Sequence, residues 1–496
     1  MDVVVVGAGA AGCVVAARIS ATANLTLLEA GPDYVSEAEL PADVADASRP
    51  TVAHDWGFTA EDDGRRTETA LPRGKLVGGC SATNAVFFLR GWPQDYDAWA
   101  AAGNPGWGYD DLLPVLRAIE TDVDFAGPEH GADGPVPVSR VATDDLPPWP
   151  RAFLDAAVAL GHRAVGDHNA IGAVGVGSLP RNVRDGRRMS TALTHLAPAR
   201  GRVEVRAGAT VDRVVHQRGQ VRGVRLLDGE ELAANVVVLC AGTYGTPGVL
   251  LRSGIGPGAE LERLGLRCAV ELPGVGANLV DHPLVAIDLP ATPGHTGPAF
   301  PVLLTLRSSA APEDPPDLHL FPAGPFDDPA SPSGAMFAIL TGLLAPRSRG
   351  SVRLRSIDPT ESPCIDPAHL REPEDLLRML AGLREARRIA ATPALAELLP
   401  GPEVHPGPGI GDDAGLADWL RGHVGSYHHP VGTCAMGTDP ASGAVVDHDG
   451  SVHGIANLYV ADASVMPTIP SANTNLTIIV VAERLADRFL RGPSSA

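Results

Sequence analysis

The sequence lacks the features that bind nucleic acids or cross membranes. Its formal net charge is −20. That charge argues against nucleic acid or an anionic membrane as a main partner, because both are negatively charged and are bound by basic surfaces. No apolar run approaches the roughly 18 residues that a membrane-spanning helix needs. We therefore expect no nucleic acid partner and no membrane span.

Paired cysteines are also missing. The six cysteines are scattered singly, with no CxxC pair. This spacing disfavours a disulfide framework or a zinc cluster, and it fits a reducing compartment. The chain opens with MDVVVVGAGAAG, which runs directly into an apolar strand without the basic segment of a secretory signal. The sequence therefore predicts a cytoplasmic protein with no metal site.

Aromatic residues are scarce, at 4% of the 496 residues. A heavily aromatic pocket is therefore not favoured, although a few residues such as Phe87 and Phe88 would be enough to build one. Hydrophobic residues make up 44% and charged residues 20%, which is ordinary for a globular protein. The length allows two large domains or one very large domain.

A glycine-rich turn follows the first predicted strand. The run Asp2–Val6 is apolar and β-branched, as in buried parallel strands, and an alanine-rich, helix-compatible stretch extends to Ile19. Between them, Gly7 allows a tight turn, Gly9 lets the backbone approach a pyrophosphate, and Gly12 lets the helix pack closely on the strand. The turn therefore predicts a dinucleotide site.

The second predicted strand, Leu25–Leu28, ends at Glu29. An acidic residue at this distance from the glycine turn is placed to accept hydrogen bonds from an adenosine ribose. The N-terminus of the intervening helix offers free N–H groups and a positive dipole end to the phosphates. These features support a dinucleotide, and they leave NAD and FAD both open.

Several longer segments extend the pattern along the chain. They read PRGKLVGGCSATN (72–84), GNPGWGYDDLLPVLRAIE (103–120), GTYGTPGVLLRSGIG (242–256), PGVGANLVDHP (273–283), LAPRSRGSVRLRSIDPTESPCIDP (344–367), SYHHPVGTCAMG (426–437) and LYVADASVMPTIPSANTNLTI (458–478). In content and order they resemble the glucose–methanol–choline (GMC) family of FAD-dependent oxidoreductases over nearly the whole length. The resemblance favours FAD over NAD.

The resemblance implies an α/β fold with an α+β cap. A Rossmann-like, doubly wound FAD-binding domain is expected from residues 1–285 and 440–496. A substrate-binding domain built on an antiparallel sheet is expected from residues 286–439. Alternation in Ser351–Arg355 predicts strands in that second domain. The stretch 308–335, rich in Pro, Ser and Asp, is either a set of loops near the site entrance or a plain connecting segment.

The resemblance also assigns cofactor contacts to individual positions. Gly78, Gly79 and Asn84 would line the flavin, Asp462 and Ala463 would contact the ribityl–pyrophosphate part, and the Val211 backbone would meet the adenine. Asn475 is assigned to the cofactor site and is also expected to cap the helix that follows. Some family members attach FAD to a histidine at the position of Thr83. Threonine cannot form that bond, so we expect noncovalent FAD.

Two adjacent histidines, His428 and His429, precede Pro430. They are compatible with a metal site, with one catalytic base beside a histidine that takes no part in the reaction, or with two ordinary polar side chains at the surface. A residue before proline favours extended backbone, in which neighbouring side chains point to opposite faces. Only one ring should therefore face the flavin. No third ligand at a suitable spacing supports a metal.

The resemblance identifies His429 as the catalytic base, and we expect His428 to be a packing residue or one that supports the residues around the base. Histidine is suited to accept a hydroxyl proton near neutral pH. The second catalytic position of the family corresponds to Asn473, six residues after Pro467. Asparagine cannot act as a general base, so Asn473 would orient the substrate oxygen.

These assignments predict a FAD-dependent oxidoreductase that converts the CH–OH group of a small-molecule alcohol to an aldehyde or ketone. The electron acceptor is oxygen or another acceptor. The alternative is an enzyme of the hydroxynitrile lyase type, in which the same fold holds a structural FAD. The identity of the alcohol stays open, and the oligomeric state stays open between monomer and dimer.

Overall fold

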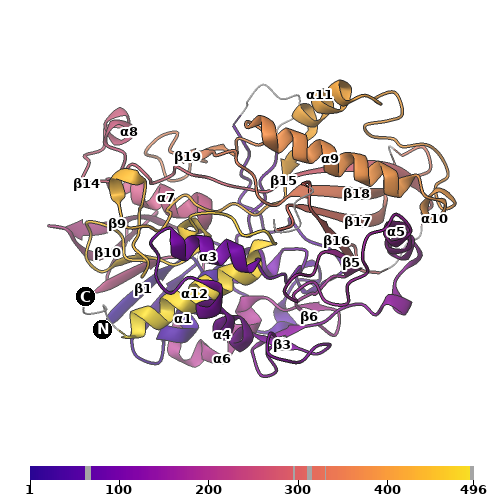
Figure 1. Cartoon of the computed structure of the whole chain (residues 1–496). Helices are drawn as coiled ribbons and strands as arrows, with labels where there is room; N and C mark the ends of the chain where they lie inside the picture. The colour runs from indigo at the N-terminus through magenta and orange to yellow at the C-terminus, as the bar shows by residue number, and fades with distance from the viewer. Residues whose placement is uncertain (62–68, 294–296, 310–314, 330, 492–496) are drawn as a thin grey trace.

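The computed structural model describes residues 1–61, 69–293, 297–309, 315–329 and 331–491. Two large sheets organise the chain, one parallel and one antiparallel, and they lie in neighbouring halves of the molecule (Figure 1). The predicted fold class, an α/β Rossmann-like unit combined with an antiparallel sheet, is confirmed.

The parallel sheet has the strand order β22-β12-β1-β2-β8. Every neighbouring pair in it is parallel. Its strands are β1 (Asp2–Val6), β2 (Asn24–Leu28), β8 (Val203–Arg206), β12 (Val236–Leu239) and β22 (Leu458–Val460). Strand β1 lies centrally, which explains why its valines are all buried. Because β22 comes from near the C-terminus, both ends of the chain contribute to one sheet.

Two helices from opposite ends of the chain pack together beside this sheet. They are α1 (Ala10–Ile19) and α12 (Thr474–Arg491), which run side by side in Figure 1. Arg18 of α1 forms ion pairs with Glu483 and Asp487 of α12. The helix that follows the glycine turn is thus held in place by the C-terminal helix.

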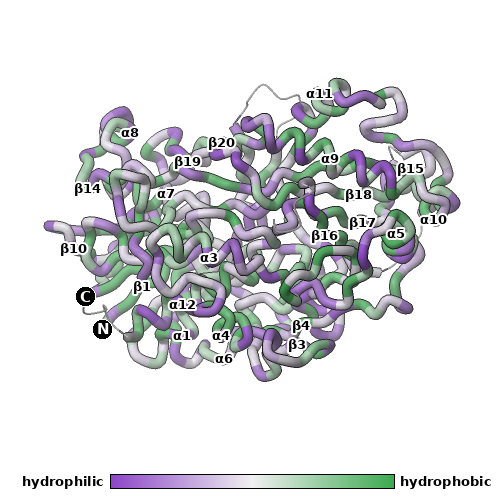
Figure 2. The backbone as a smooth tube through the Cα atoms, in the orientation of Figure 1, coloured by the Kyte–Doolittle hydropathy of each residue, from purple (hydrophilic) through white to green (hydrophobic). Residues whose placement is uncertain are grey.

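The antiparallel sheet has the strand order β21-β15-β18-β17-β16-β5. Its strands are β5 (Gly175–Ser178), β15 (Pro283–Ala291), β16 (Val302–Leu306), β17 (Leu318–Asp327), β18 (Ala335–Leu343) and β21 (Gly425–Ser426). Helices α5 (Pro148–Ala159), α9 (Pro373–Ala390) and α11 (Asp413–His423) share one hydrophobic core with one face of this sheet. Figure 2 shows hydrophobic segments around β16 and β17. On the other face, Leu303 and Phe321 pack in a second, smaller cluster with Tyr427.

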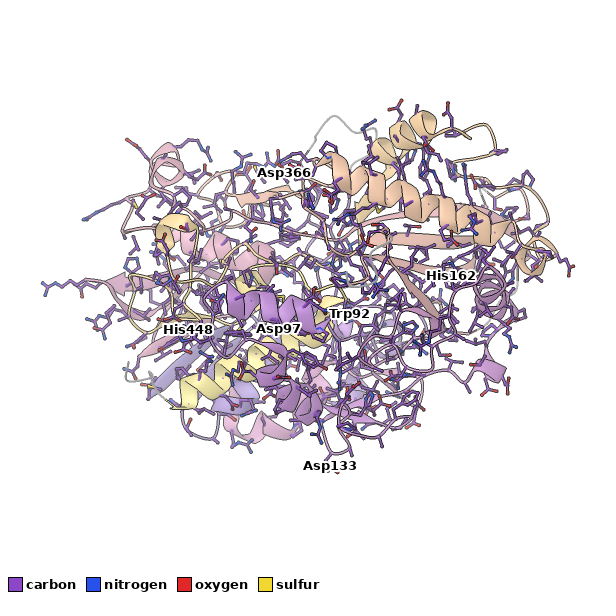
Figure 3. The ribbon with its side chains drawn as sticks, in the orientation of Figure 1. Trp92, Asp97, Asp133, His162, Asp366 and His448 are labelled. Atoms are coloured by element: carbon purple, nitrogen blue, oxygen red, sulfur yellow. The ribbon has the colours of Figure 1, made fainter. Side chains whose placement is uncertain are left out.

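Two elements of the antiparallel unit come from the range 1–285. Strand β5 pairs with β16, and α5 packs in the same core. His162, labelled in Figure 3, follows α5 and joins it to α9 through a 2.8 Å contact between its Nε2 and Glu385 Oε1. The domain division between residues 285 and 286 stays a prediction. We propose that the segment around α5 and β5 belongs with residues 286–439.

The strand predicted from Ser351–Arg355 exists, but it does not join the large antiparallel sheet. It is β19 (Ser351–Arg353), and it pairs with β20 (Cys364–Asp366) in a separate two-stranded sheet. The backbone N–H of Val352 donates to the carbonyl of Gly276 at 2.7 Å. Alternation in the sequence identifies a half-buried strand, and it does not say which sheet the strand joins.

The expectation of loops over 308–335 is wrong for its central part. Strand β17 occupies Leu318–Asp327 despite Pro322 and Pro325. A register irregularity between Ala323 and Phe326 accommodates the second proline. Residues 310–314 and 330 of this stretch lie outside the described residues.

The remaining elements are short or connect the two units. The helices are α2 (Ala42–Ala45), α3 (Pro93–Ala101), α4 (Tyr109–Ile119), α6 (Ala197–Ala199), α7 (Gly242–Arg252), α8 (Gly258–Arg263) and α10 (Pro393–Ala396). The strands are β3 (Glu120–Asp122), β4 (Val136–Val138), β6 (Val183–Arg184), β7 (Arg187–Arg188), β9 (Val211–Gln217), β10 (Gln220–Leu226), β11 (Glu231–Ala233), β13 (Ile255–Gly256) and β14 (Val270–Glu271). None of the described helices combines the length and the apolar character needed to cross a bilayer.

Candidate active site

The three glycines of the first turn have different surroundings. A Cβ atom on Gly12 would lie 1.8 Å from the carbonyl oxygen of Gly7, and one on Gly7 would lie 2.5 Å from that of Cys240. A Cβ atom on Gly9 would meet nothing within 4 Å. Gly7 and Gly12 are therefore required for close packing of strand and helix. Gly9 leaves open space at the start of α1, as a pyrophosphate requires.

Glu29 stands at the end of β2 beside this turn. Its carboxylate accepts hydrogen bonds from the backbone N–H groups of Ala8 at 3.0 Å and Gly31 at 2.9 Å. Burial raises the pKa of Glu29 to about 7. The N–H of Ala209 donates to the Glu29 carbonyl at 2.8 Å, which brings the beginning of β9, at Val211, to the same edge of the sheet. The predicted ribose and adenine contacts thus lie close together.

The loop of the second glycine motif lies directly on the first. The N–H of Gly78 donates to the carbonyl of Ala8 at 2.7 Å, and a Cβ atom on Gly79 would lie 2.6 Å from Gly9 Cα. Further along, Asn84 Oδ1 accepts a 2.9 Å hydrogen bond from the N–H of Val86. That valine has φ +58°, a strained backbone for a β-branched residue. Asn84 therefore stabilises an unusual turn next to the predicted flavin position.

The side chain of Asp462 is used within the protein. Its carboxylate accepts hydrogen bonds from Gly242 N at 2.8 Å, Thr246 Oγ1 at 2.7 Å and Ser464 N at 2.8 Å. It thereby joins the end of β22 to the start of α7. The neighbouring carbonyl of Ala463 accepts from the N–H of Gly432 at 3.2 Å. The predicted ribityl–pyrophosphate contacts of Asp462 and Ala463 stay a prediction, and for Asp462 the backbone is the part left to make one.

Asn475 was expected both to bind the cofactor and to cap a helix. The capping expectation is wrong, because α12 begins at Thr474 and Asn475 already lies in its first turn. Its Nδ2 is buried and has no hydrogen-bond partner among the described residues. Buried N–H donors are normally paired, so this one is available to an acceptor on a bound cofactor. Together with the open space at Gly9, it shows that the residues present fit FAD.

His429 lies between two polar side chains. Its Nε2 is 3.1 Å from Asn473 Nδ2, and its Nδ1 is 3.0 Å from His282 Nδ1. The ring of Tyr427 covers it at a centroid distance of 4.4 Å. Burial lowers the pKa of His429 well below its ordinary value, and His282, His428 and Arg73 lower it further. The imidazole is therefore neutral at neutral pH.

These contacts assign the protons of both rings. In this orientation of the Asn473 amide, Nδ2 donates to His429 Nε2, which then accepts and bears no proton. Nδ1 of His429 then bears the proton and donates it to His282 Nδ1. Burial lowers the pKa of His282 to about 3, so that ring is also neutral and can accept. The unprotonated Nε2 is thus on the side of Asn473.

His428 differs from the expectation. Its φ is +68°, so the backbone before His429 is left-handed rather than extended. The residue is exposed and its ring has no hydrogen-bond partner in the described part of the chain, and its expected packing or supporting role stays a prediction. Its carbonyl accepts a 2.9 Å hydrogen bond from Arg73 Nη2. The preference for extended backbone that Pro430 imposes therefore applies to His429 and does not extend to His428.

The segment carrying His429 is held against residues 280–284. Strand β21 pairs with the start of β15, and Val280 and Val431 exchange backbone hydrogen bonds. Asp281 Oδ1 accepts from the His429 N–H at 2.8 Å. This pairing brings together two histidines that are 147 positions apart.

Asn473 is held in place from another direction. Asp95 of α3 accepts hydrogen bonds from Ser471 N at 2.8 Å and from Ser471 Oγ at 2.9 Å. Burial raises the pKa of Asp95 to about 6. The loop before α12 is therefore tied to α3, and Asn473 Oδ1 remains buried without a partner among the described residues.

Sequence reasoning missed the supporting residues of this site. His282 and Asp281 lie in the segment PGVGANLVDHP, which was singled out without a role for its acid–histidine pair. That pair just before a proline was the available signal. Tyr427 and Asp95 carried no signal, because their importance depends on contacts made only in the folded chain.

A buried ionic cluster was also missed. Single ligand atoms of Glu120, Asp122 and His130 lie within 4.8 Å of one another, as in some metal sites. However, Arg90 Nη2 binds Glu120 Oε1 at 2.6 Å, and Arg140 Nη1 binds Asp122 Oδ1 at 2.9 Å. These guanidinium groups supply the positive charge that the carboxylates need. We interpret the cluster as an ion-pair network.

Comparison with known proteins places the chain in a family. Residues 1–284 and 346–482 match the N-terminal and C-terminal models of the GMC oxidoreductases. An uncharacterised GMC-type oxidoreductase from Rhodococcus erythropolis is 36% identical over 97% of both chains. An oxygen-dependent choline dehydrogenase from Vibrio vulnificus is 34% identical over 99% of this chain and 94% of its own.

Similarity to solved structures supports the same family. The crystal structure of pyridoxine 4-oxidase from Mesorbium loti has a TM-score of 0.90 and 31% identity, and the match covers 99% of each chain. The matches extend over both sheets and the site. FAD is the cofactor, and the chain belongs to the GMC oxidoreductase family.

Proposed function

We propose that this flavoenzyme oxidises the CH–OH group of an alcohol to an aldehyde or ketone, with His429 as the general base. The observation that carries the proposal is the buried pair of His429 and Asn473, whose Nε2 and Nδ2 atoms lie 3.1 Å apart. FAD, when bound, supplies the hydride acceptor. The named relatives, which act on choline and pyridoxine, support an alcohol as substrate.

His429 would remove the hydroxyl proton. Its Nε2 accepts that proton, while its Nδ1 keeps the hydrogen bond to His282. The Nδ2 group of Asn473 would turn from the imidazole to the substrate oxygen and donate to it as negative charge develops. Tyr427 covers the ring and excludes water from one side.

The residues proposed to hold the cofactor lie around the ends of β1 and β2. Gly9 and the start of α1 would take the pyrophosphate, Glu29 the ribose, and Asn84 and Asn475 the flavin part. Thr83 offers no histidyl bond, so we propose noncovalent attachment. Either oxygen or another acceptor would reoxidise the cofactor.

The test is anaerobic flavin reduction by a panel of alcohols. Bleaching of the flavin absorbance is expected with true substrates, and air then separates an oxidase from a dehydrogenase. His429→Ala should lower the reduction rate by about 10²–10⁴-fold. His428→Ala is the matched control and should do far less. Cleavage of a substrate without bleaching would instead indicate a lyase of the hydroxynitrile type.

A further inference from the structure

The residue just before His429 has an unusual backbone conformation. His428 has φ +68°, in the left-handed region that few residues with a Cβ atom adopt. Pro430 restricts only the backbone of His429, so it does not impose this turn. A strained backbone persists only where the surrounding structure holds it, and it is often found at functional sites. The surrounding residues must therefore hold the turn at His428.

Two buried side chains bind the N–H groups of this turn. Ser426 Oγ accepts a hydrogen bond from the His428 N–H at 2.7 Å, and Asp281 Oδ1 accepts one from the His429 N–H at 2.8 Å. The hydroxyl of Ser426 in turn donates to Asp281 Oδ2. Ser426 and Asp281 are only 5% and 3% exposed, so water does not compete for these bonds. We call Asp281 and Ser426 the clasp.

The carbonyl group of His428 is bound by a third side chain. It accepts a 2.9 Å hydrogen bond from Arg73 Nη2. Burial raises the pKa of Asp281, whereas the hydrogen bond from Ser426 and the positive charge of Arg73 lower it. Arg73 therefore stabilises both the carbonyl side of the turn and the charged form of the clasp.

The turn lies in a bulge between two paired segments. The loop that carries the proposed base pairs with residues 280–283 at Ser426 and again at Val431. Between these two points, residues 427–430 lie opposite residues 281–282. The longer segment must bulge, and bulges of this kind redirect side chains next to active sites. A bulge has many possible shapes, so the clasp is placed to select one of them.

Resting on the proposed role of His429 as the base, we propose that Asp281 and Ser426 are positioning residues for it. They hold the left-handed turn at His428, and this turn places the His429 ring against Asn473. Neither member of the clasp touches the substrate or the cofactor. When the turn relaxes, the ring shifts and the base loses its alignment with the carbinol oxygen, which lowers the rate of proton removal.

A rescue experiment on the holoenzyme tests the turn. Ser426→Ala removes the acceptor of the His428 N–H, and it should lower the rate of anaerobic flavin reduction about tenfold with little change in KM. Adding His428→Asn should recover most of that loss, because asparagine adopts left-handed backbone more readily. Adding His428→Val instead should deepen the loss, because a β-branched residue resists positive φ. A general structural defect would not respond in opposite directions to these two changes.

Variants of Asp281 test the other member of the clasp. Asp281→Ala removes the acceptor for the His429 N–H and for Ser426, and it should lower the reduction rate by about 10- to 100-fold. Asp281→Asn retains an acceptor for the His429 N–H and should lose less. Asp133→Asn is the control, since this exposed residue lies at the lower edge of the molecule in Figure 3. A wild-type rate in Ser426→Ala, or a loss that His428→Asn does not reduce, would overturn the proposal.

A measurement without turnover separates the two proposals. Histidine labelled with an NMR-active nitrogen isotope reports the ring of His429 in the holoenzyme, and His429→Ala identifies its signals. The wild type should give a single sharp set, Ser426→Ala should broaden or double it, and adding His428→Asn should restore it. If no alcohol bleaches the flavin, the proposed function fails, and these signals still decide whether the clasp positions the ring. Unchanged His429 signals in Ser426→Ala would overturn the clasp.

Discussion

At the scale of single residues, the site depends on the protonation of one imidazole. Burial is the largest cause of the lowered pKa of His429, and the neighbouring His282 is the next. A base must be unprotonated to act, so it works above its pKa and fails below it. The lowered pKa therefore extends the working range of His429 toward acid pH.

The pH dependence of flavin reduction tests this. The rate constant should be constant around neutral pH and should fall only at pH values well below 6.5, the ordinary pKa of histidine. Stopped-flow reduction with a saturating alcohol measures it. A rate that already falls on going from pH 8 to pH 7 would contradict the protonation state assigned to His429.

In the proposed mechanism, His282 positions the base and does not touch the substrate. His282→Leu removes the acceptor for the Nδ1 proton of His429, and should lower the reduction rate by about 10- to 100-fold with little change in KM. Because His282 lowers the pKa of His429, the variant should also lose activity at a higher pH than the wild type does. His282→Asn, which retains an acceptor, should restore part of the rate.

A control variant separates the positioning role of His282 from a general loss of activity caused by replacing a histidine. His423→Leu removes an exposed histidine from α11 and should leave both the rate and its pH profile unchanged. A rate loss in His282→Leu without any shift of the acid limb would mean that His282 is merely structural.

At the scale of elements, the strand–turn–helix unit of β1 and α1 combines packing with the proposed binding of the cofactor. The two tasks fall on different glycines. The Gly12 position is enclosed by the Gly7 carbonyl, whereas the Gly9 position is open. Gly9 has φ −72°, which alanine adopts without strain.

Alanine substitutions therefore have different expected outcomes. Gly9→Ala should fold normally and lose FAD affinity by about tenfold or more, because the added methyl occupies the space for the pyrophosphate. Gly12→Ala should lower the free energy of unfolding by about 2 kcal/mol or more, because strand and helix must separate. FAD titration and thermal unfolding of the FAD-free proteins measure the two effects. Equal loss of stability in both variants would contradict the assignment.

At the scale of the whole molecule, FAD links segments from both ends of the chain. The proposed contacts extend from Gly9 to Asn475, so the bound cofactor should stabilise the entire fold. Thr83 lies where a covalent histidine would be needed. Denaturation followed by filtration should therefore release all the yellow colour, and FAD-free protein should unfold at a lower temperature. Flavin retained on the denatured chain would refute noncovalent binding.

Much of the fold and part of the site could be predicted from local patterns. The strand Asp2–Val6 has the predicted bounds, and the predicted strand Leu25–Leu28 begins one residue earlier, at Asn24, since a short β-branched run between turn residues favours one local structure. The strands of the antiparallel sheet were predicted less accurately from the sequence. Leu318–Asp327 contains two prolines that favour loops locally, and its pairing with β16 and β18 overrides them.

The sequence by itself determined the family and the glycine turn, and it led to the proposal of Glu29, His429 and Asn473 as site residues, because each of these depends on residues that are neighbours along the chain. Only the tertiary structure decided that His282 lies 3.0 Å from His429 Nδ1 and that Tyr427 covers the His429 ring. These features arise where strands from distant parts of the chain pair. Such pairing is set by packing and burial over the whole molecule, which no local pattern records.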